Sequence, residues 1–186
     1  AMTVSELTDM LIEPTERERG RFITYEGADG CGKSTQMRLS AEYLRARGYD
    51  VVPTREPGGS PIAERIRNVV LGIENKGMTD ECEALLFAAA RVEHVRSVIL
   101  PAISEGKIVL CDRFLDSSIA YQARGRELGD DFIRQINKAS SDLIQPDRTL
   151  LFDISRESAR ARMASGVPLD RLEIEKEDFF RRVSAR

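Results

Sequence analysis

Short apolar runs alternate with longer amphipathic stretches along this chain. Four runs have the length and composition of β-strands, at residues 21–26, 50–55, 108–111 and 149–153. The last two are apolar almost throughout, which is typical of strands buried on both faces of a parallel sheet. Because strands alternate with helical stretches, the pattern predicts a three-layer α/β fold in which helices flank a parallel sheet.

The stretches between the strands carry apolar residues at helical spacing. Ser60-Pro61 and Thr79 are expected to begin two of the helices, and Gly48 is expected to end another. The apolar side of the longest helix is expected to run along Leu85, Leu86, Ala89, Val92, Val95 and Ile99. The predicted helices cover residues 33–47, 62–71, 80–102, 115–123, 130–143 and 173–186, and a further helix begins at Ser155.

Length and pattern favour one domain with an extension before it. The chain has 186 residues, which suits a single domain. Residues 1–20 precede the first strand, and residues 14–20 are charged, so we expect an extension or linker there and the folded domain over residues 21–186. Three-layer domains of this kind usually carry a fifth strand, so a C-terminal strand is expected to be absent from this chain.

Composition narrows the class of protein. Hydrophobic residues make up 41% and charged residues 32% of the chain, as in ordinary soluble proteins, and the net charge of −3 predicts no nucleic-acid-binding surface. Cys31, Cys82 and Cys111 lack metal-type spacing, which favours a reduced, cytoplasmic protein. Neither a membrane-spanning run nor a signal peptide is expected.

The first predicted strand leads directly into a glycine-rich loop. Residues 27–34 read Gly-Ala-Asp-Gly-Cys-Gly-Lys-Ser, which fits the P-loop pattern, and a helical stretch follows. The glycines allow the loop N–H groups to face phosphate oxygens, and the helix adds the positive end of its dipole. Lys33 supplies charge for the β- and γ-phosphates, and Ser34 a hydroxyl for Mg²⁺. The residues expected to bind ATP are Gly27, Ala28, Asp29, Gly30, Cys31, Gly32, Lys33, Ser34 and Thr35.

Features outside the P-loop separate the classes of P-loop protein. The guanine-reading pattern Asn-Lys-x-Asp is absent, because residues 137–140 read Asn-Lys-Ala-Ser. The third strand ends in Asp112-Arg113-Phe114, without the glutamate that a mechanical ATPase uses to align water. Asp112 is the second expected Mg²⁺ contact, and Arg113 beside it indicates an acceptor phosphate to be held.

Four separate blocks resemble the thymidylate kinases of the bacterial type. They are residues 27–35, Thr-Arg-Glu-Pro-Gly-Gly at 54–59, Leu-Phe-Ala-Ala-Ala-Arg at 86–91, and Asp-Arg-Phe-Leu-Asp-Ser-Ser-Ile-Ala-Tyr-Gln at 112–122. Order and spacing fit this family from about residue 21 to residue 183. The resemblance implies transfer of phosphate from ATP, with Mg²⁺, to dTMP in dTTP biosynthesis. It also implies a homodimer packed through helices, with the helix at 80–102 as a candidate face.

The resemblance assigns roles to residues of the acceptor site. Phe87 is implied to stack on thymine and Arg91 to bond a base oxygen, although spacing alone favours a core phenylalanine and a surface arginine. Asp29 is implied to hold the 3′-hydroxyl, and Tyr121 to crowd a 2′-hydroxyl. The residues implied to bind the acceptor are Asp29, Arg55, Glu56, Arg67, Phe87, Arg91, Arg113, Ser117, Ser118, Tyr121 and Gln122.

The variable P-loop positions contain no basic residue, so the resemblance implies that a mobile lid over residues 156–172 supplies one. Lys33, Arg113, Arg160, Arg162 and Arg171 are therefore the candidate catalytic residues. The sequence does not rank the three lid arginines, and each could instead be a helix-surface charge. The family's other basic position in this lid is occupied by Gly166-Val167-Pro168.

Two other functions stay open. Another nucleoside monophosphate kinase or a deoxynucleoside kinase would share the P-loop and an Asp-Arg segment, but usually lacks Thr-Arg-Glu-Pro-Gly-Gly. A nucleotide-binding module without turnover is the alternative outside the enzymes.

Overall fold

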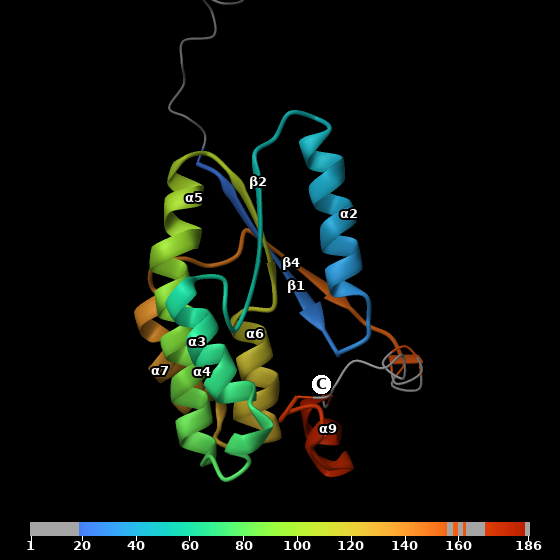
Figure 1. Ribbon diagram of the computed structural model, residues 1–186, viewed down its shortest axis with the longest axis vertical. Helices are drawn as coiled ribbons and strands as arrows, with labels where there is room; N and C mark the ends of the chain where they lie inside the picture. The colour runs from blue at the N-terminus through green and yellow to red at the C-terminus, as the bar shows by residue number, and fades with distance from the viewer. Residues whose placement is uncertain (1–18, 156–157, 160–161, 163–169, 185–186) are drawn as a thin grey trace, which may run out of the picture.

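Four parallel strands form the centre of the molecule. The structure is a computed structural model that describes residues 19–155, 158–159, 162 and 170–184. Its sheet has the order β2-β3-β1-β4 (Figure 1), and β1 pairs in parallel with both β3 and β4. The strands are β1 (Arg21–Gly27), β2 (Val51–Arg55), β3 (Ile108–Asp112) and β4 (Arg148–Phe152), so all four predicted strands and the parallel sheet are confirmed.

Helices cover both faces of this sheet and complete three layers (Figure 1). Helix α2 (Lys33–Arg45) lies on one face, and the helical elements between β2 and β4 gather on the other side. These are α3 (Pro61–Leu71), the short η1 (Ile73–Asn75), α4 (Asp80–His94), η2 (Val95–Ile99), α5 (Leu100–Ser104), α6 (Leu115–Ser118), η3 (Ile119–Gly125) and α7 (Asp130–Ser141). Helix α9 (Glu177–Val183) packs against η3 near the carboxyl end of the sheet.

The two faces of the sheet bury alternate residues of the same strands, as the period of two requires. Phe22 of β1 and Val109 of β3 pack against η2 and α5, where the rings of Phe22 and Phe114 meet edge to face at 5.0 Å. Tyr25 and Leu110 point to the opposite face and pack against α2. The P-loop and the end of β3 are therefore fixed by cores on both sides of the sheet.

Strand β4 differs from the prediction that it is buried. Leu151 is 72% exposed and Leu150 is also exposed. The strand is the outermost of the sheet, with β1 as its only partner among the described residues. An apolar run fits a central strand and an edge strand equally well, because the spacing of apolar residues does not show which other elements pack against the strand.

The predicted helix over residues 80–102 is one continuous helical run that contains a π-helical turn. The turn is η2, where the N–H of Leu100 bonds the carbonyl of Val95 five residues earlier. Pro101 follows directly and lacks an N–H, so it disturbs the regular ladder at this point. The predicted apolar side is correct for Val95 and Ile99 but wrong for Leu85, which is 51% exposed, and for Ala89, which is also exposed.

The remaining helices fit the sequence less closely. The predicted helix at 115–123 begins at Leu115 but continues as the π-helical η3. The predicted helix over 173–186 begins only at Glu177, because residues 171–174 form a turn in which Leu172 N and Glu173 N donate to Asp170 Oδ1. The extension and most of the predicted lid lie outside the described residues. Within the described residues, no helix combines the length and apolarity needed to span a membrane.

Candidate active site

The P-loop bends sharply between β1 and α2. Gly27, Gly30 and Gly32 have φ values of 142°, 76° and 100°, in the region that favours glycine. A Cβ on Gly27 would lie 2.5 Å from the carbonyl oxygen of Phe152, so backbone contact also excludes a side chain there. The loop therefore presents backbone N–H groups at the start of α2, a position suited to anions.

Lys33 and Ser34 occupy the first turn of α2. Lys33 Nζ donates to the carbonyl oxygens of Gly27 and Ala28 at 2.9 and 2.8 Å. Burial lowers the pKa of Lys33, and the nearby Arg113 lowers it further. Ser34 Oγ donates to Asp112 Oδ2 at 2.6 Å, so the two predicted metal contacts lie together. Hydroxyl and carboxylate oxygens are the donors that Mg²⁺ prefers, and these two residues could hold such an ion.

Two cavities meet beside the P-loop. The first is lined by the loop and the start of α2, together with Arg55, Asp112 and Arg162. The second extends toward Phe87 and Leu172, and its wall includes residues of α3, α4, α6 and η3. Both cavities are lined by the same four residues at their junction: Asp29, Glu56, Arg67 and Arg113.

Arg113 lies at the centre of this junction. It follows β3 with a φ of 70°, and its guanidinium donates to Gly27 O and Ser117 Oγ, both at 3.1 Å, and to Asp29. Burial opposes ionisation of Asp29, but Arg113 and Lys33 outweigh it and lower the pKa of Asp29. Tyr121 donates its hydroxyl to Asp29 Oδ2 at 3.2 Å, and burial raises the pKa of Tyr121 to about 12. The carboxylate is thus ionised and the phenol neutral near neutral pH.

Arg55 and Arg67 stand on the other side of the junction. Arg67 Nη1 donates to Pro57 O at 2.7 Å, and burial together with the charge of Arg55 lowers the pKa of Arg67. Arg55 ends β2 and pairs with Glu64 of α3 at 3.1 Å. With Arg113, these side chains place three guanidinium groups at or beside the junction, next to the carboxylates of Asp29 and Glu56.

Arg91 and Glu56 form a buried pair in the wall of the second cavity. Arg91 is 2% exposed, and its Nε donates to Glu56 Oε2 at 2.6 Å. Its other N–H groups reach the Asn137 amide oxygen, Phe114 O and Ser118 Oγ. His94 Nδ1 lies 3.0 Å from the second oxygen of Glu56. Arg91 is therefore neither a surface charge nor a loose side chain, and His94 is structural.

The other residues implied to hold base and sugar gather around the same cavity. Phe87, Ser117, Ser118, Tyr121 and Gln122 all line it. Phe87 belongs to an apolar cluster at the end away from the P-loop. This end is apolar and the junction is charged, a polarity that suits a ligand with a base at one end and a phosphate at the other.

Glu26 is a site residue that the sequence reasoning missed. It is buried near the end of β1 and accepts from Phe114 N at 2.7 Å and Ser117 Oγ at 2.6 Å, while burial raises its pKa. The carboxylate thereby fixes the start of α6 against the P-loop strand. The available signal was an acidic residue at the end of a strand, directly before the first glycine of the P-loop.

The three lid arginines have different positions. Arg160 lies outside the described residues. Arg162 lines the P-loop cavity, and its Nη1 donates to Cys31 O at 3.5 Å. Arg171 is buried away from the P-loop, where its guanidinium donates to Glu83 and to Val70 O.

This fold and site define a P-loop phosphotransferase that has a separate cavity for a second, phosphate-bearing substrate. The family model for thymidylate kinase matches residues 25–186. The thymidylate kinases of Pelotomaculum thermopropionicum and Finegoldia magna are 49% and 52% identical, over 89% and 87% of this chain and 77% and 80% of theirs. A crystal structure of thymidylate kinase from Ehrlichia chaffeensis matches with a TM-score of 0.68 and 41% identity, covering 77% of this chain and 82% of that one.

The chain therefore belongs to the thymidylate kinase family. The family predicted from the four sequence blocks is confirmed, and with it the class of activity, a phosphotransfer that converts dTMP to dTDP.

Proposed function

We propose that this chain transfers the γ-phosphoryl group of ATP to dTMP, with Mg²⁺, as a homodimer in the cytoplasm. The observation that carries the proposal is the meeting of the P-loop cavity and the acceptor cavity at Asp29, Arg67 and Arg113. Two phosphates can be brought together there between fixed cations, and alignment supplies most of what phosphoryl transfer requires.

On the donor side, the loop N–H groups and Lys33 hold the ATP phosphates. Lys33 Nζ, which donates to two loop carbonyls, is close enough to exchange these partners for phosphate oxygens. Ser34 and Asp112 would hold Mg²⁺. When bound, Mg²⁺ neutralises charge on the transferring group.

On the acceptor side, Arg67 and Arg113 hold the 5′-phosphate, with Arg55 and Glu56 beside them. Arginine suits this role because its planar fork can bond a phosphate at two points. Asp29 accepts a hydrogen bond from the 3′-hydroxyl, and its lowered pKa keeps it ionised for that purpose. The acceptor phosphate is already anionic, so the reaction needs no strong base.

The remaining roles follow the polarity of the acceptor cavity. Phe87 faces the thymine ring, and Arg91, Ser118 and Gln122 border it. Tyr121 lies beside Asp29 and excludes a 2′-hydroxyl. The domain spans residues 21–186 with a lid over residues 156–172, from which Arg160 or Arg162 meets the transferring group. Arg162 has the support of its place in the P-loop cavity.

The homodimer is proposed to pack through α4. Leu85 and Ala89 lie one turn apart on its exposed side, where the sequence predicted a buried face. An exposed apolar stripe on a helix is typical of an interface. Light scattering tests the dimer directly, because it measures the mass of the particle and one chain has a mass of 20.9 kDa. A monomer at assay concentrations would contradict the dimer.

A coupled assay tests the reaction. The protein is supplied with ATP and Mg²⁺ and with dTMP, dUMP, dCMP, dGMP or thymidine in parallel. We expect the highest kcat/KM with dTMP and no activity when the metal is chelated. Preference for thymidine would identify a deoxynucleoside kinase, and binding of dTMP without turnover would identify a nucleotide-binding module.

A further inference from the structure

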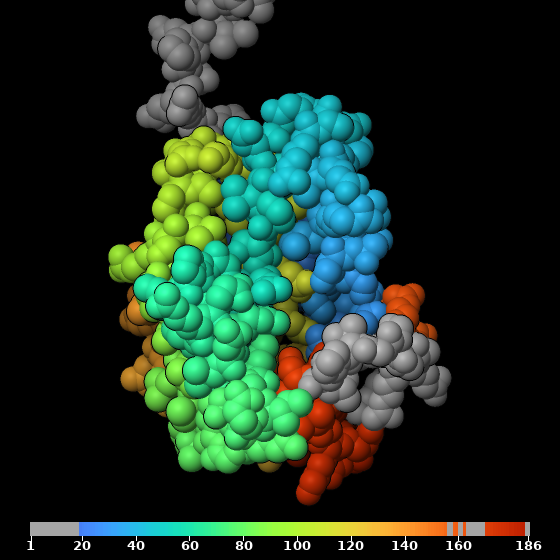
Figure 2. Space-filling model, viewed as in Figure 1, coloured from blue at the N-terminus to red at the C-terminus, as the bar shows by residue number. Residues whose placement is uncertain are grey.

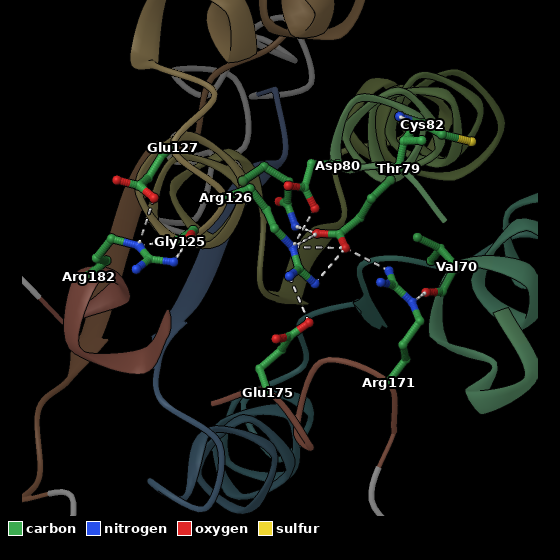
Figure 3. A network of polar contacts seen from close by, with 12 residues as sticks. Val70, Thr79, Asp80, Cys82, Gly125, Arg126, Glu127, Arg171, Glu175 and Arg182 are labelled. Atoms are coloured by element: carbon green, nitrogen blue, oxygen red, sulfur yellow. Dashed lines mark hydrogen bonds and ion pairs between the residues drawn. The ribbon is translucent and has the colours of Figure 1, made fainter. Parts of the chain in front are cut away.

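A buried carboxylate, Glu83, lies behind the acceptor cavity without lining it. Glu83 belongs to α4 and is 0% exposed. Its Oε1 accepts from Gln122 Nε2 at 2.9 Å, and its Oε2 accepts from Arg126 and Arg171 at 2.9 and 2.7 Å (Figure 3). One side chain thus connects α4, the π-helical η3 and the C-terminal end of the predicted lid.

Arg171 is held from three directions. Besides its bond to Glu83, its Nε donates to Val70 O at 2.9 Å, and its backbone N donates to Leu71 O at 3.1 Å. The side chain is buried. An arginine that met the transferring phosphate would have to give up both side-chain partners and leave Glu83 short of a buried cation, which is unfavourable.

The neighbours of Arg171 form one wall of the acceptor cavity. Asp170, Leu172 and Glu173 all line it, and Leu172 packs with Val70 and Phe87. The space-filling view shows the C-terminal segment, in red, directly beside the green helices α3 and α4 (Figure 2). The position of this wall therefore depends on what fastens Arg171.

Arg126 makes a second connection from the same carboxylate. It pairs with Glu175 at 2.7 Å and with Asp80 at 3.3 Å, and its guanidinium lies 4.6 Å from the ring centre of Phe179. Phe179 in turn contacts the ring of Tyr121, with 6.1 Å between ring centres. The acidic groups balance both arginines, so neither cation lacks a counter-charge in the network.

We propose that Glu83 and Arg171 are positioning residues for the acceptor nucleotide, and that Arg171 is not a catalytic lid arginine. Their ion pair holds residues 170–173 as the wall that faces the base, while the same carboxylate orients Gln122 on the neighbouring wall. The inference rests on the proposed function, because it takes the second cavity to be the dTMP site. It makes dTMP affinity, and not the rate of transfer, the property that depends on this pair.

The test uses Arg171→Ala and Arg171→Lys, with Arg181→Ala as the matched control. Arg181 belongs to the same C-terminal segment but forms an exposed pair with Asp178. Arg171→Ala is expected to raise KM and Kd for dTMP by about tenfold or more, a change worth about 1.4 kcal/mol. At saturating substrates its kcat stays within about threefold of wild type. Arg171→Lys keeps a cation for Glu83 and recovers part of the dTMP affinity, while KM for ATP is unchanged in every variant.

Glu83→Gln serves as the second variant from the other side of the pair. The change keeps the shape of the side chain and an acceptor oxygen but removes the negative charge that pairs with Arg171. We therefore expect dTMP affinity to fall, as in Arg171→Ala. Thermal unfolding of each variant shows that the assays are made on folded protein. If Glu83→Gln does not fold, the two Arg171 variants alone decide.

Two results would overturn the inference. A loss of kcat by about 10³-fold in Arg171→Ala, with calorimetric dTMP binding unchanged, would make Arg171 a transition-state arginine. A fall in stability with unchanged dTMP affinity would make the pair merely structural. The substrate assay of the wild-type protein tests the proposed function separately. A preference for another monophosphate would refute dTMP as the substrate. The affinities of the variants relative to wild type would then be measured for that nucleotide.

Discussion

Replacing Arg91 with alanine separates a structural role from a direct contact with the base. The change removes hydrogen bonds to Glu56, Ser118, Asn137 and Phe114 O at a site that is 2% exposed. The Glu56 carboxylate would keep His94 as a neighbour but lose its buried cation. Breaking a buried ion pair by removing one partner costs about 3–5 kcal/mol of the free energy of unfolding.

The loss is large enough to measure in two ways. In a domain of this size, 1 kcal/mol lowers Tm by roughly 2–4 °C, so Arg91→Ala should melt about 6–20 °C below wild type. Urea unfolding should show a lower midpoint at an unchanged slope. The control is Arg38→Ala, which removes an exposed pair with Glu42 and should cost at most about 1 kcal/mol.

Nucleotide binding distinguishes the two roles. If the pair is chiefly structural, dTMP raises the free energy of unfolding of Arg91→Ala and of wild type by similar amounts, each measured against the same protein without dTMP. If instead Arg91→Ala unfolds within about 1 kcal/mol of wild type and loses only dTMP affinity, our reasoning from the buried pair is refuted. The direct contact with a base oxygen that the family resemblance implies would then be supported.

Four further changes test the site. Lys33→Ala should remain folded and lose about 10³-fold or more in kcat through lost charge stabilisation, and near-normal turnover would refute the P-loop assignment. Arg162→Ala should lower kcat by roughly 10³–10⁵ while calorimetric dTMP binding stays unchanged, and kcat within about threefold of wild type would refute its lid role. Tyr121→Ala should narrow the kcat/KM preference for dTMP over ribothymidine monophosphate by about tenfold or more, and an unchanged ratio would show that another residue excludes the 2′-hydroxyl. The pKa of Asp29 is lowered from 3.8, because Arg113 and Lys33 outweigh burial, so its contribution to stability is present above pH 3.8 and lost as the pH falls through the folded-state pKa. The difference in unfolding free energy between wild type and Asp29→Asn should shrink in that acidic range, and a difference independent of pH would contradict the shift.

The elements that sequence predicted well are those set by local chemistry. The P-loop needs glycine conformations, a strand before it and a helix after it, all within one short stretch. The helix starts at Ser60 and Thr79 depend on capping side chains three residues from the N–H groups that they accept. The strands were likewise identified from the length and composition of short local runs, two of which are apolar almost throughout.

The elements that sequence missed depend on distant partners. Leu151 is exposed because of where β4 lies in the sheet, which its own residues do not encode. Glu83 reads as a surface charge until Gln122, Arg126 and Arg171 converge on it from later parts of the chain. The burial of Arg171 likewise depends on Glu83, Val70 and Leu71, which lie far from it in the sequence.

Three buried glutamates explain how a site rich in arginine is held in place in an acidic protein. Both oxygens of Glu26, Glu56 and Glu83 engage protein groups, so each carboxylate holds a different part of the proposed acceptor site. Glu26 holds Ser117, Glu56 holds Arg91, and Glu83 holds Arg171 next to Leu172. Because these side chains are ordered on folding, less entropy is lost when the nucleotide binds. The negative charges of Glu56 and Glu83 are paired with arginines, so these carboxylates repel a bound phosphate less than unpaired ones would, which lets acidic residues support a site built for anions.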